Sequence, residues 1–484
     1  MSSDRGPHTP TIHILDAYSL LNVFYLSRPA LIDGSESDNN QLLEGGEWNR
    51  ERWWYRLIQV CRRWRYIVLE SSVHLRLALV CARGTPVADM LKHSPPLPII
   101  IDHVDQDYDI TEADEEGIIH ALQHRDRVRR IRLRKSAPIL ERLVNALDGV
   151  FPILDYLFVR SQEHVRPTIK HNMTLKFPET FRAPRVLDLL LMHFNISIGS
   201  PLLADMRNLV TLSLNLIPSS AYFHLDALLQ RLSSIPQLKI LGIIFNSPFR
   251  SRDIERQSSR IPRTTQVALP NLRWLGFKGT SAYLEALLAH VTVPLLEKLQ
   301  VYFFNQLSYS IPHLQHSMRA AENLRIKTIT LSFREDYLNV RAYPYKGAKL
   351  YTLSTELSGR NVDWQVASAA QVFRELSTAS SAVEHLTLEH ARRIVSSEWH
   401  NEADRTQWRE LLGSFRNVKT LFVDGEFVGQ VSCALQPDEG ESPTELLPEL
   451  QELSYSAIDS SLDVFARFID ARQKAGRPVT MIRP

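Results

Sequence analysis

A short pattern of apolar positions recurs along most of the chain. An apolar residue is followed by two variable residues, a second apolar residue, one variable residue and a third apolar residue. The two closely spaced apolar residues point to one face of an extended strand, so each copy predicts a short strand. The copies are Val128, Ile131, Leu133; Leu154, Leu157, Val159; Val186, Leu189, Leu191; Leu209, Leu212, Leu214; Leu238, Leu241, Ile243; Leu272, Leu275, Phe277; Leu296, Leu299, Val301; Ile326, Ile329, Leu331; Val383, Leu386, Leu388; Val418, Leu421, Val423; and Leu450, Leu453, Tyr455.

Amphipathic stretches with helical spacing lie between the predicted strands, at Leu225 to Leu232, Tyr283 to Leu288 and Val366 to Leu376. Most copies of the strand pattern are roughly 23 to 35 residues apart, which overlaps the period of leucine-rich repeats. We therefore expect an α/β leucine-rich-repeat solenoid, with parallel strands on its concave side and helices on its convex side. An ordinary α/β domain is the alternative, but the eleven copies exceed the strands of a usual single sheet.

The repeat pattern makes specific structural predictions. One continuous parallel sheet should run from about Leu75 to Tyr455. A weaker copy at Leu350, Leu353 and Thr355 predicts one more repeat, which should pair with the strand around Ile329 after a long loop at 337–348. The asparagine that usually follows the strand is mostly missing, Asn246 being one of the few fits, so the solenoid should be irregular. Five leucines should be almost fully buried: Leu212, Leu241, Leu275, Leu299 and Leu421.

Residues before about 72 do not carry the pattern. Residues 1–11 read as a flexible tail, 12–72 as a helical segment and 73–484 as the irregular solenoid. The helical segment has two amphipathic pieces, Ile14 to Leu26 and Arg52 to Ser71. Between them, Asp33 to Glu47 is acidic and contains glycine, which predicts a loop inserted into the segment.

Composition narrows the classes of function. The 484 residues are 44% hydrophobic and 23% charged, with a net charge of +2, so no global field draws the chain onto nucleic acid or a membrane. There are three cysteines, far apart, which fits a reducing compartment. The N-terminus has no apolar signal core, and no apolar run approaches the roughly 20 residues of a membrane helix. A cytoplasmic or nuclear location follows as an expectation.

No motif of an enzyme active site is present. Phosphate-binding glycine loops, a nucleophile elbow and paired-histidine zinc motifs are all missing, so we expect no catalytic residues, no cofactor and no metal. His385 and His390 flank an apolar strand together with Glu384 and Glu389. These residues are more typical of the solvated face of a strand than of a metal site.

Two charge runs stand out in the sequence, and the basic residues of the second alternate with Val128, Ile131 and Leu133 along a predicted strand. The acidic run, Asp105 to Glu116, lacks the spacing of a calcium loop and is expected to start a helix. The basic run, Arg125 to Lys135, has no interleaved aromatic residues for nucleic acid, and Arg132 and Arg134 should point to solvent on the concave surface. A second basic stretch, Arg250 to Arg263, predicts a solvated loop. Other residues expected near or on exposed strand faces are Arg160, Ser213, Lys278, Gln300 and Glu389.

Several motifs resemble one protein family. Val60-Cys61-Arg62-Arg63-Trp64-Arg65 matches the core of the F-box motif, and Leu15 through Phe24 can be laid on its opening. Asp16 stands where that motif has proline, and Ser19 where it has an apolar residue. Further motifs make the chain similar to the F-box-like leucine-rich-repeat proteins of mushroom-forming (basidiomycete) fungi: Arg50 to Tyr55, Cys81 to Met90, Ser94 to Pro98, Asp363 to Ser368 and Ala382 to Leu386.

This resemblance implies a function. The helical segment would bind a Skp-type adaptor, which joins it to a cullin–RING ubiquitin ligase, and the repeats would select an unknown protein substrate. Alternatively, the tryptophans of this segment only cap the first strand of the solenoid, and the chain is a ligase-independent protein-interaction scaffold. By resemblance, the adaptor-facing surface or its support would comprise Leu15, Leu20, Leu21, Val23, Phe24, Leu57, Val60 and Trp64.

Overall fold

The computed structural model describes residues 15–29, 52–104, 110–161, 175–218, 221–248, 265–304, 306, 308–390, 403–437, 440, 442, 444–456 and 464–482. The predicted tail, the acidic loop at 33–47, the basic stretch at 250–263 and the start of the acidic run at 105–109 lie outside these residues. The chain divides into two compact units, residues 1–193 with 200–207, and residues 194–199 with 208–484. The predicted division at residue 72 stays a prediction.

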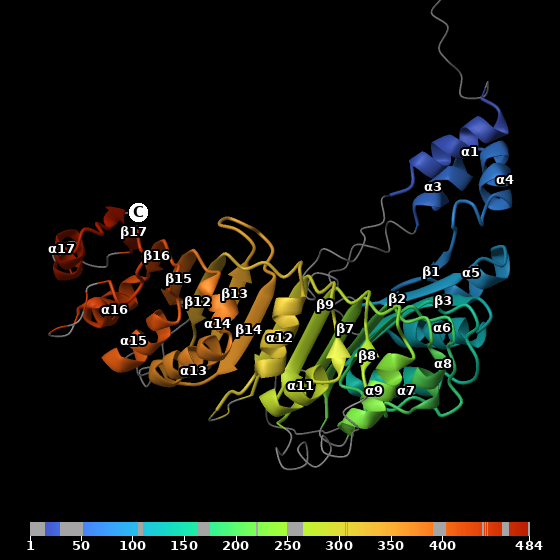
Figure 1. Ribbon diagram of the computed structural model, residues 1–484. Helices are drawn as coiled ribbons and strands as arrows, with labels where there is room; N and C mark the ends of the chain where they lie inside the picture. The colour runs from blue at the N-terminus through green and yellow to red at the C-terminus, as the bar shows by residue number, and fades with distance from the viewer. Residues whose placement is uncertain are drawn as a thin grey trace, which may run out of the picture. The chain divides into compact units, whose positions relative to one another are not determined.

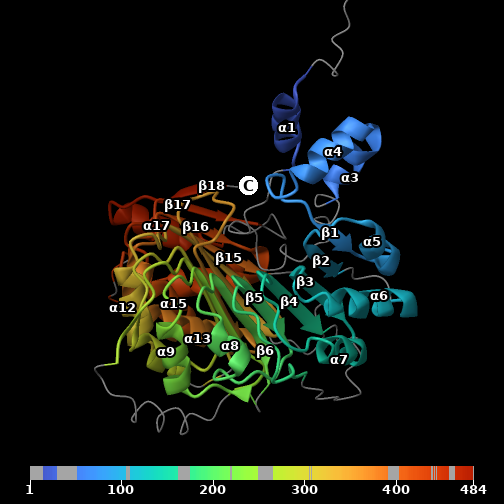
Figure 2. The same cartoon turned by 90° about the vertical axis from the view of Figure 1, so that its right-hand side faces the viewer.

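In the described part of the first unit, helices α1, α3 and α4 come first, and alternating strands and helices follow them (Figures 1 and 2). Its strands β1 to β5 pair in parallel, each with the next along the chain. Figure 2 shows α5, α6 and α7 along one side of these strands. The elements are α1 (Ala17–Leu26), α3 (Trp53–Val60), α4 (Arg62–Glu70), β1 (Leu79–Cys81), α5 (Val87–His93), β2 (Ile99–His103), α6 (Glu112–Gln123), β3 (Val128–Lys135), α7 (Ala137–Asn145), β4 (Tyr156–Ser161), β5 (Asp188–Met192) and α8 (Pro201–Asp205).

The acidic run begins a helix, as its charge predicted. Thr111 caps α6, where its hydroxyl accepts a hydrogen bond from the backbone N–H of Asp114. Glu112, Asp114 and Glu115 occupy the first turn, where carboxylates interact favourably with the positive end of the helix dipole.

The second unit continues the alternation of strands and helices. Figure 1 shows α11, α12, α13 and α15 along the same face of its strands. Among the described residues of both units, no helix is both long and apolar enough to span a bilayer. The elements are β6 (Thr211–Ile217), α9 (Leu225–Ser233), β7 (Ile240–Phe245), β8 (Val267–Ala268), β9 (Trp274–Gly279), α11 (Ser281–Leu288), β10 (Val291–Thr292), β11 (Lys298–Phe303), α12 (Pro312–Ala320), β12 (Thr328–Phe333), β13 (Tyr337–Tyr343), β14 (Leu353–Ser358), α13 (Val362–Glu375), α14 (Ser377–Ser381), β15 (His385–His390), α15 (Arg405–Gly413), β16 (Thr420–Val423), η4 (Gly425–Phe427), α16 (Val428–Leu435), β17 (Glu452–Tyr455), α17 (Ala466–Lys474) and β18 (Thr480–Ile482).

The leucines of the repeat pattern stack in register across neighbouring strands. Leu241 pairs with Leu275, and Leu275 pairs with Leu299 on the next strand. Because side chains alternate along a strand, the partners of the pattern share the face that the helices cover. The prediction of buried leucines is confirmed: their exposures are 0% for Leu212, 1% for Leu241, 3% for Leu275, 1% for Leu299 and 1% for Leu421. The structure is thus a mixed α/β stack of strand–helix repeats.

One segment corrects the prediction of a wholly parallel sheet. Residues 337–343 form strand β13 and not a loop, and β13 runs antiparallel to both β12 and β14. The predicted extra repeat exists as β14, but β14 pairs with β11 and β13, so its predicted pairing with the strand around Ile329 is wrong. Tyr337 to Tyr343 alternates polar and apolar residues, which suits a strand, but the tyrosine–proline–glycine sequence after it favoured a loop.

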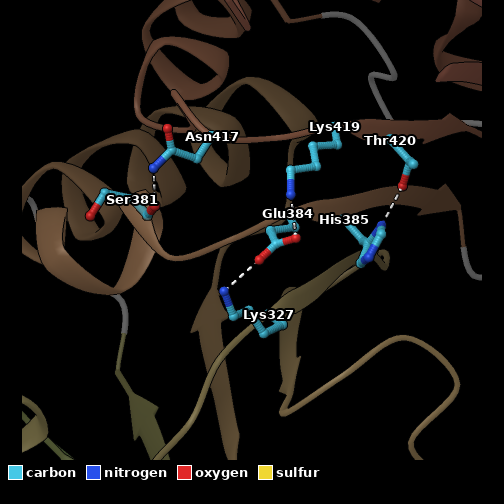
Figure 3. A network of polar contacts seen from close by, with 7 residues as sticks. All are labelled: Lys327, Ser381, Glu384, His385, Asn417, Lys419 and Thr420. Carbon is cyan, nitrogen blue, oxygen red and sulfur yellow. Dashed lines mark hydrogen bonds and ion pairs between the residues drawn. The ribbon is translucent and has the colours of Figure 1, made fainter. Parts of the chain in front are cut away.

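Ion pairs just before the strands join neighbouring repeats of this chain, in which the asparagine that usually follows the strand is mostly missing. Asn246 itself is exposed, so it forms no buried ladder. Glu384 lies one residue before β15, and its carboxylate pairs with Lys327 before β12 and with Lys419 before β16, the latter at 2.8 Å (Figure 3). Arg273 and Glu297 pair at the equivalent positions before β9 and β11. These pairs recur where adjacent strands begin.

Asparagines in the turns before the strands add a second link between repeats. The Asn417 amide donates to the Ser381 carbonyl at 2.7 Å, as Figure 3 shows, and the Asn271 amide donates to the Pro236 carbonyl at 3.2 Å. Both asparagines stand three residues before their strand and bond to the preceding repeat. Backbone carbonyls in the turns therefore receive hydrogen bonds from asparagines that lie before the strand instead of after it.

The stacked leucines should dominate the stability of the repeats. Leu275→Ala is expected to lower the free energy of unfolding by about 2–5 kcal/mol, because it removes buried methyl groups and leaves a cavity. The exposed Leu350 is the matched control, and Leu350→Ala should stay within about 0.5 kcal/mol. Urea denaturation of both variants measures the difference, and an unchanged Leu275→Ala midpoint would contradict the assigned register.

The ion pairs of Glu384 make a prediction about pH. Hydrogen bonds from Lys327 and Lys419 lower the pKa of Glu384 from 4.5 to about 2. The pairs therefore contribute stability above the ordinary pKa, and that contribution is lost as the pH falls towards 2. An NMR titration of the side-chain carboxyl, assigned with Glu384→Gln, should show a midpoint near 2.

Removing one cation tests the cause of this shift. Lys419→Met should raise the pKa of Glu384 towards 4.5, since one of the two donated hydrogen bonds disappears. Lys298→Met is the control, because the Lys298 ammonium lies 4.2 Å from the Tyr351 ring centroid and takes no part in the pair. A wild-type midpoint near 4.5 would contradict the ion pairs.

Candidate protein-binding surfaces

The helices before β1 have a small apolar core of their own. Leu20 and Phe24 of α1 are 0% and 1% exposed. The Phe24 ring meets the Trp64 ring of α4 edge-on, with centroids 4.7 Å apart. Val68, one turn further along α4, is also fully buried. Helices α1 and α4, which lie 35 residues apart in sequence (Leu26 to Arg62 exclusive), are therefore held together by an aromatic contact.

The departures from the F-box opening have a local explanation. Asp16 is the N-cap of α1, and its carboxylate accepts a hydrogen bond of 2.7 Å from the backbone N–H of Ser19. This hydrogen bond also lowers the pKa of Asp16, which keeps the cap charged. Asp16 therefore starts the helix at a position where the motif has a proline.

The helical segment exposes an unusually large number of apolar side chains. Among the described residues, fifteen large hydrophobic side chains are exposed, and eight of them lie between positions 15 and 73. Exposed apolar groups at this density are typical of a contact surface. We call these eight residues the apolar face, and they are Leu15, Tyr18, Val23, Tyr25, Leu26, Val60, Tyr66 and Val73.

The predicted adaptor-binding residues divide between this face and the core. Leu15, Val23 and Val60 are exposed, with exposures of 38%, 43% and 57%. Leu20 and Phe24 are buried, so they support the surface and do not form it. The remaining three, Leu21, Leu57 and Trp64, are half-buried.

Sequence reasoning missed five members of the apolar face, two of them highly exposed residues of α1. Tyr18 and Leu26 are 73% and 81% exposed, and both lie on α1 away from Leu20 and Phe24. The signal was available, because helical spacing places residues 18, 22, 25 and 26 away from the side that 20 and 24 share.

Helix α3 connects the helical segment to the first repeat. The indole N–H of Trp54, which is 2% exposed, donates to the Ala78 carbonyl at 3.2 Å, just before β1. The Tyr55 ring stacks on Trp54 with centroids 4.4 Å apart. The guanidinium of Arg52 donates to the Val80 carbonyl at 3.2 Å, within β1 itself. Trp54 thus acts as a cap on the first strand, whereas Trp64 serves the core of the helical segment.

The strand face opposite the helices, here called the open face, corrects one prediction. Arg132 does not point to solvent: its side chain is 7% exposed and forms an ion pair of 3.0 Å with Asp102 on β2. On β4, burial lowers the pKa of Arg160, and the nearby charge of Arg134 adds to this effect. The basic run on β3 therefore contributes a buried charge pair to the open face.

On the open face of the second unit, one aromatic ring, that of Trp274, packs over two glycines. Gly242 and Gly276 pair with one another on β7 and β9. The Trp274 ring lies across both: a Cβ added at Gly242 would lie 3.3 Å from it, and one at Gly276 would overlap it. The half-buried ring therefore needs glycine at position 276 and leaves little room for a side chain at position 242.

A row of polar residues crosses the same face, one residue per strand. Lys278, Tyr302 and Glu356 pair in sequence on β9, β11 and β14. Asn339 on β13 donates to the Glu356 carboxylate at 3.3 Å, and burial raises the pKa of Glu356. The row mixes donors, acceptors and both signs of charge, as the polar rim of a protein contact does.

The histidines of β15 lie on opposite faces of their strand. His385 meets the Thr420 hydroxyl at 2.7 Å, as Figure 3 shows, whereas His390 is 8% exposed on the helix-covered side. They cannot share a metal ion. In the part of the chain that the structure describes, no cluster of three histidine, cysteine or carboxylate side chains is placed to hold a metal.

Comparisons with known proteins add little to these contacts. No protein-family model matches the sequence, and no curated protein matches it. Among solved structures, a crystal structure of a TLR13–ssRNA13 complex matches with a TM-score of 0.30 and 11% identity over 83% of this chain. This chain covers 48% of that one, so it spans about half the length of the protein it matches. A likeness at this TM-score supports no conclusion about function.

The packing of the Trp274 ring over Gly276 predicts the effect of adding one methyl group at position 276. Gly276→Ala should displace the Trp274 ring from the open face, because the new Cβ would occupy the ring's position. The 5-fluorotryptophan NMR signal of Trp274, assigned with Trp274→Phe, should therefore shift. Gly429→Ala is the control, since nothing lies within 4 Å of a Cβ at Gly429. Unchanged spectra for both variants would show that the ring lies elsewhere.

Proposed function

We propose that this chain is an F-box-like substrate receptor of a cullin–RING ubiquitin ligase. Its helical segment, α1, α3 and α4, binds a Skp-type adaptor, and the open face of its repeats binds a protein substrate. The observation that carries the proposal is the apolar face, which collects more than half of the large hydrophobic side chains that the described residues expose. The resemblance of residues 60–65 to the F-box core supports the identity of the partner.

The energetics favour a partner on the apolar face. Tyr18 and Leu26 lose most of their water contact only if another surface covers them. Burying a leucine or tyrosine side chain stabilises an interface by roughly 1.5–3 kcal/mol. Interfaces concentrate their energy in a few such anchors. Because the helical segment has a core of its own, it stays folded while these residues are exposed to a partner.

The open face supplies the second contact. Trp274 is half-buried, and Lys298 occupies the paired position on the neighbouring strand β11. The Lys298 ammonium lies over the Tyr351 ring. Aromatic residues are enriched at the energetic centres of protein interfaces. The charged row beside them would orient the substrate. Nothing in this arrangement requires a cofactor, a metal or nucleic acid.

The location of the chain follows from this function. The ligase partners act in the cytoplasm or nucleus, which are reducing compartments. All three cysteines, Cys61, Cys81 and Cys433, are free. Free thiols support the same location.

A ligase-independent scaffold is the second candidate, and one observation favours it. Trp54 and Arg52 bond directly to the backbone at β1, so the helical segment already serves as the cap that a repeat stack needs. A cap alone does not account for the high exposure of Tyr18 and Leu26. Adaptor binding separates the two candidates.

Adaptor binding is tested with substitutions on the apolar face. Tyr18→Asp with Leu26→Asp should weaken binding of a purified Skp-type adaptor about tenfold or more, because two charges would lose water at the contact. Phe24 is unsuitable, since a charge against Trp64 would disrupt the segment itself. Titration calorimetry with the full chain gives the dissociation constants of the wild type and of the double variant for the adaptor.

A matched pair on the repeats controls for lost hydrophobicity. Tyr345→Asp with Leu350→Asp places the same charges at exposures of 63% and 52%, outside the helical segment. This variant should bind the adaptor as the wild type does, and circular dichroism should show both variants folded. A wild-type chain that does not bind, where a known F-box protein does, would favour the scaffold.

A further inference from the structure

Two half-buried arginines lie side by side on the open face of the first unit. Arg134 on β3 pairs with Arg160 on the neighbouring strand β4 (Figure 2). Each follows the last buried residue of its repeat pattern, Leu133 or Val159. Because side chains alternate along a strand, both arginines lie on the face opposite the helices.

This pair of cations has no counter-charge of its own. The Nε and Nη1 atoms of Arg134 are buried and have no hydrogen-bond partner. Burial lowers the pKa of Arg160, and the charge of Arg134 lowers that pKa further. In the described part of the chain, neither guanidinium forms an ion pair. Two like charges therefore stand at paired positions, where their repulsion destabilises the sheet.

The other arginines of the basic run are arranged differently. Arg129 donates to the Asp155 carboxylate at 2.7 Å, and Arg132 pairs with Asp102 at 3.0 Å. The described residues supply an acceptor to every other arginine of the run, but none to Arg134. Buried polar groups are normally hydrogen-bonded, and a buried donor without an acceptor costs free energy. The missing acceptor is therefore what a ligand would supply.

The surroundings of the two arginines are apolar. Met192 on β5 occupies the position paired with Arg160. Two residues earlier on the same strands, Phe158 pairs with Leu190, and the alternation of side chains places all four on the open face. Phe158 is buried, whereas Leu190 and Met192 are half-buried. A ligand at this position meets two guanidinium groups beside partly exposed aliphatic side chains.

Charge and surroundings together select the class of ligand. Guanidinium groups bind carboxylates through charge-assisted hydrogen bonds, which are stronger where water is partly excluded. Nucleic acid would need cations spread along a phosphate backbone, and the neighbouring arginines of the run already have partners.

We propose that Arg134 and Arg160 bind the carboxylate of an aspartate or glutamate in the protein substrate. An apolar residue of the substrate, next to that carboxylate, packs on Leu190 and Met192. This inference rests on the proposed function, because it takes the open face as the surface that binds the substrate.

Binding of short peptides to the full chain tests the proposal. The probe is a labelled peptide in which glutamate alternates with leucine, and its control has glutamine in place of glutamate. Fluorescence anisotropy should show that the glutamate peptide binds about tenfold or more tightly than the glutamine peptide. Binding of the glutamate peptide should weaken as salt is raised, because the arginines are only half-buried.

Variants of the two arginines locate the site. Arg134→Met with Arg160→Met should weaken binding of the glutamate peptide about tenfold or more, since methionine keeps the apolar part of the side chain and removes the charge. The urea midpoint of this variant should stay unchanged or rise, because the repulsion disappears. Arg185→Met with Arg207→Met is the matched control. It removes two exposed arginines of the same unit that lie outside its strands, and it should leave binding unchanged.

Four results overturn the proposal: no binding of the glutamate peptide, equal affinity for the two peptides, equal loss in both double variants, or a lower urea midpoint for the first variant. A phosphoserine version of the peptide that binds more than about tenfold tighter would assign phosphate to the site instead of carboxylate.

The assay contains no adaptor, so it can fail separately from the proposed function. A chain that binds the adaptor but does not discriminate between the peptides contradicts this inference alone. A chain that binds the glutamate peptide but no adaptor supports the inference and favours the scaffold.

Discussion

The in-register pairing of the repeat strands is the constraint on which the other features depend. A single repeat cannot bury its apolar face, so each one is stable only when its leucines align with those of its neighbours. Leu275 meets Leu241 on one side and Leu299 on the other, and the backbone ladder holds all three at the same height. This alignment places the helices on one face and leaves one row of variable side chains after another on the opposite face.

The inserted strand shows how strictly the register is kept. β13 reverses the chain direction, yet Val340 pairs with Leu331 on one side and Thr355 on the other. Side chains alternate in the same way in either direction, so an antiparallel strand can enter the sheet without moving an apolar residue to the wrong face. The insertion also extends the open face, because Asn339 joins the polar row through Glu356.

The helical segment before β1 combines two tasks that sequence patterns tend to present as alternatives. Trp54 bonds to the end of the repeat stack, while Trp64 closes a core with Phe24. Those contacts account for Trp54 and Trp64 but not for the exposed residues of α1. Capping and the proposed adaptor binding are therefore compatible in one segment.

The sequence by itself determined the repeats, their buried leucines and the helices between them, because those follow from the local periodicity of apolar positions. It also located the helical segment and three of its eight exposed large apolar residues. Only the tertiary structure decided that Leu20 and Phe24 face inward, that Arg132 pairs with Asp102 and that β13 separates β12 from β14. Each of these depends on a neighbour distant in sequence. Local periodicity shows which residues share a face, but not what that face will meet.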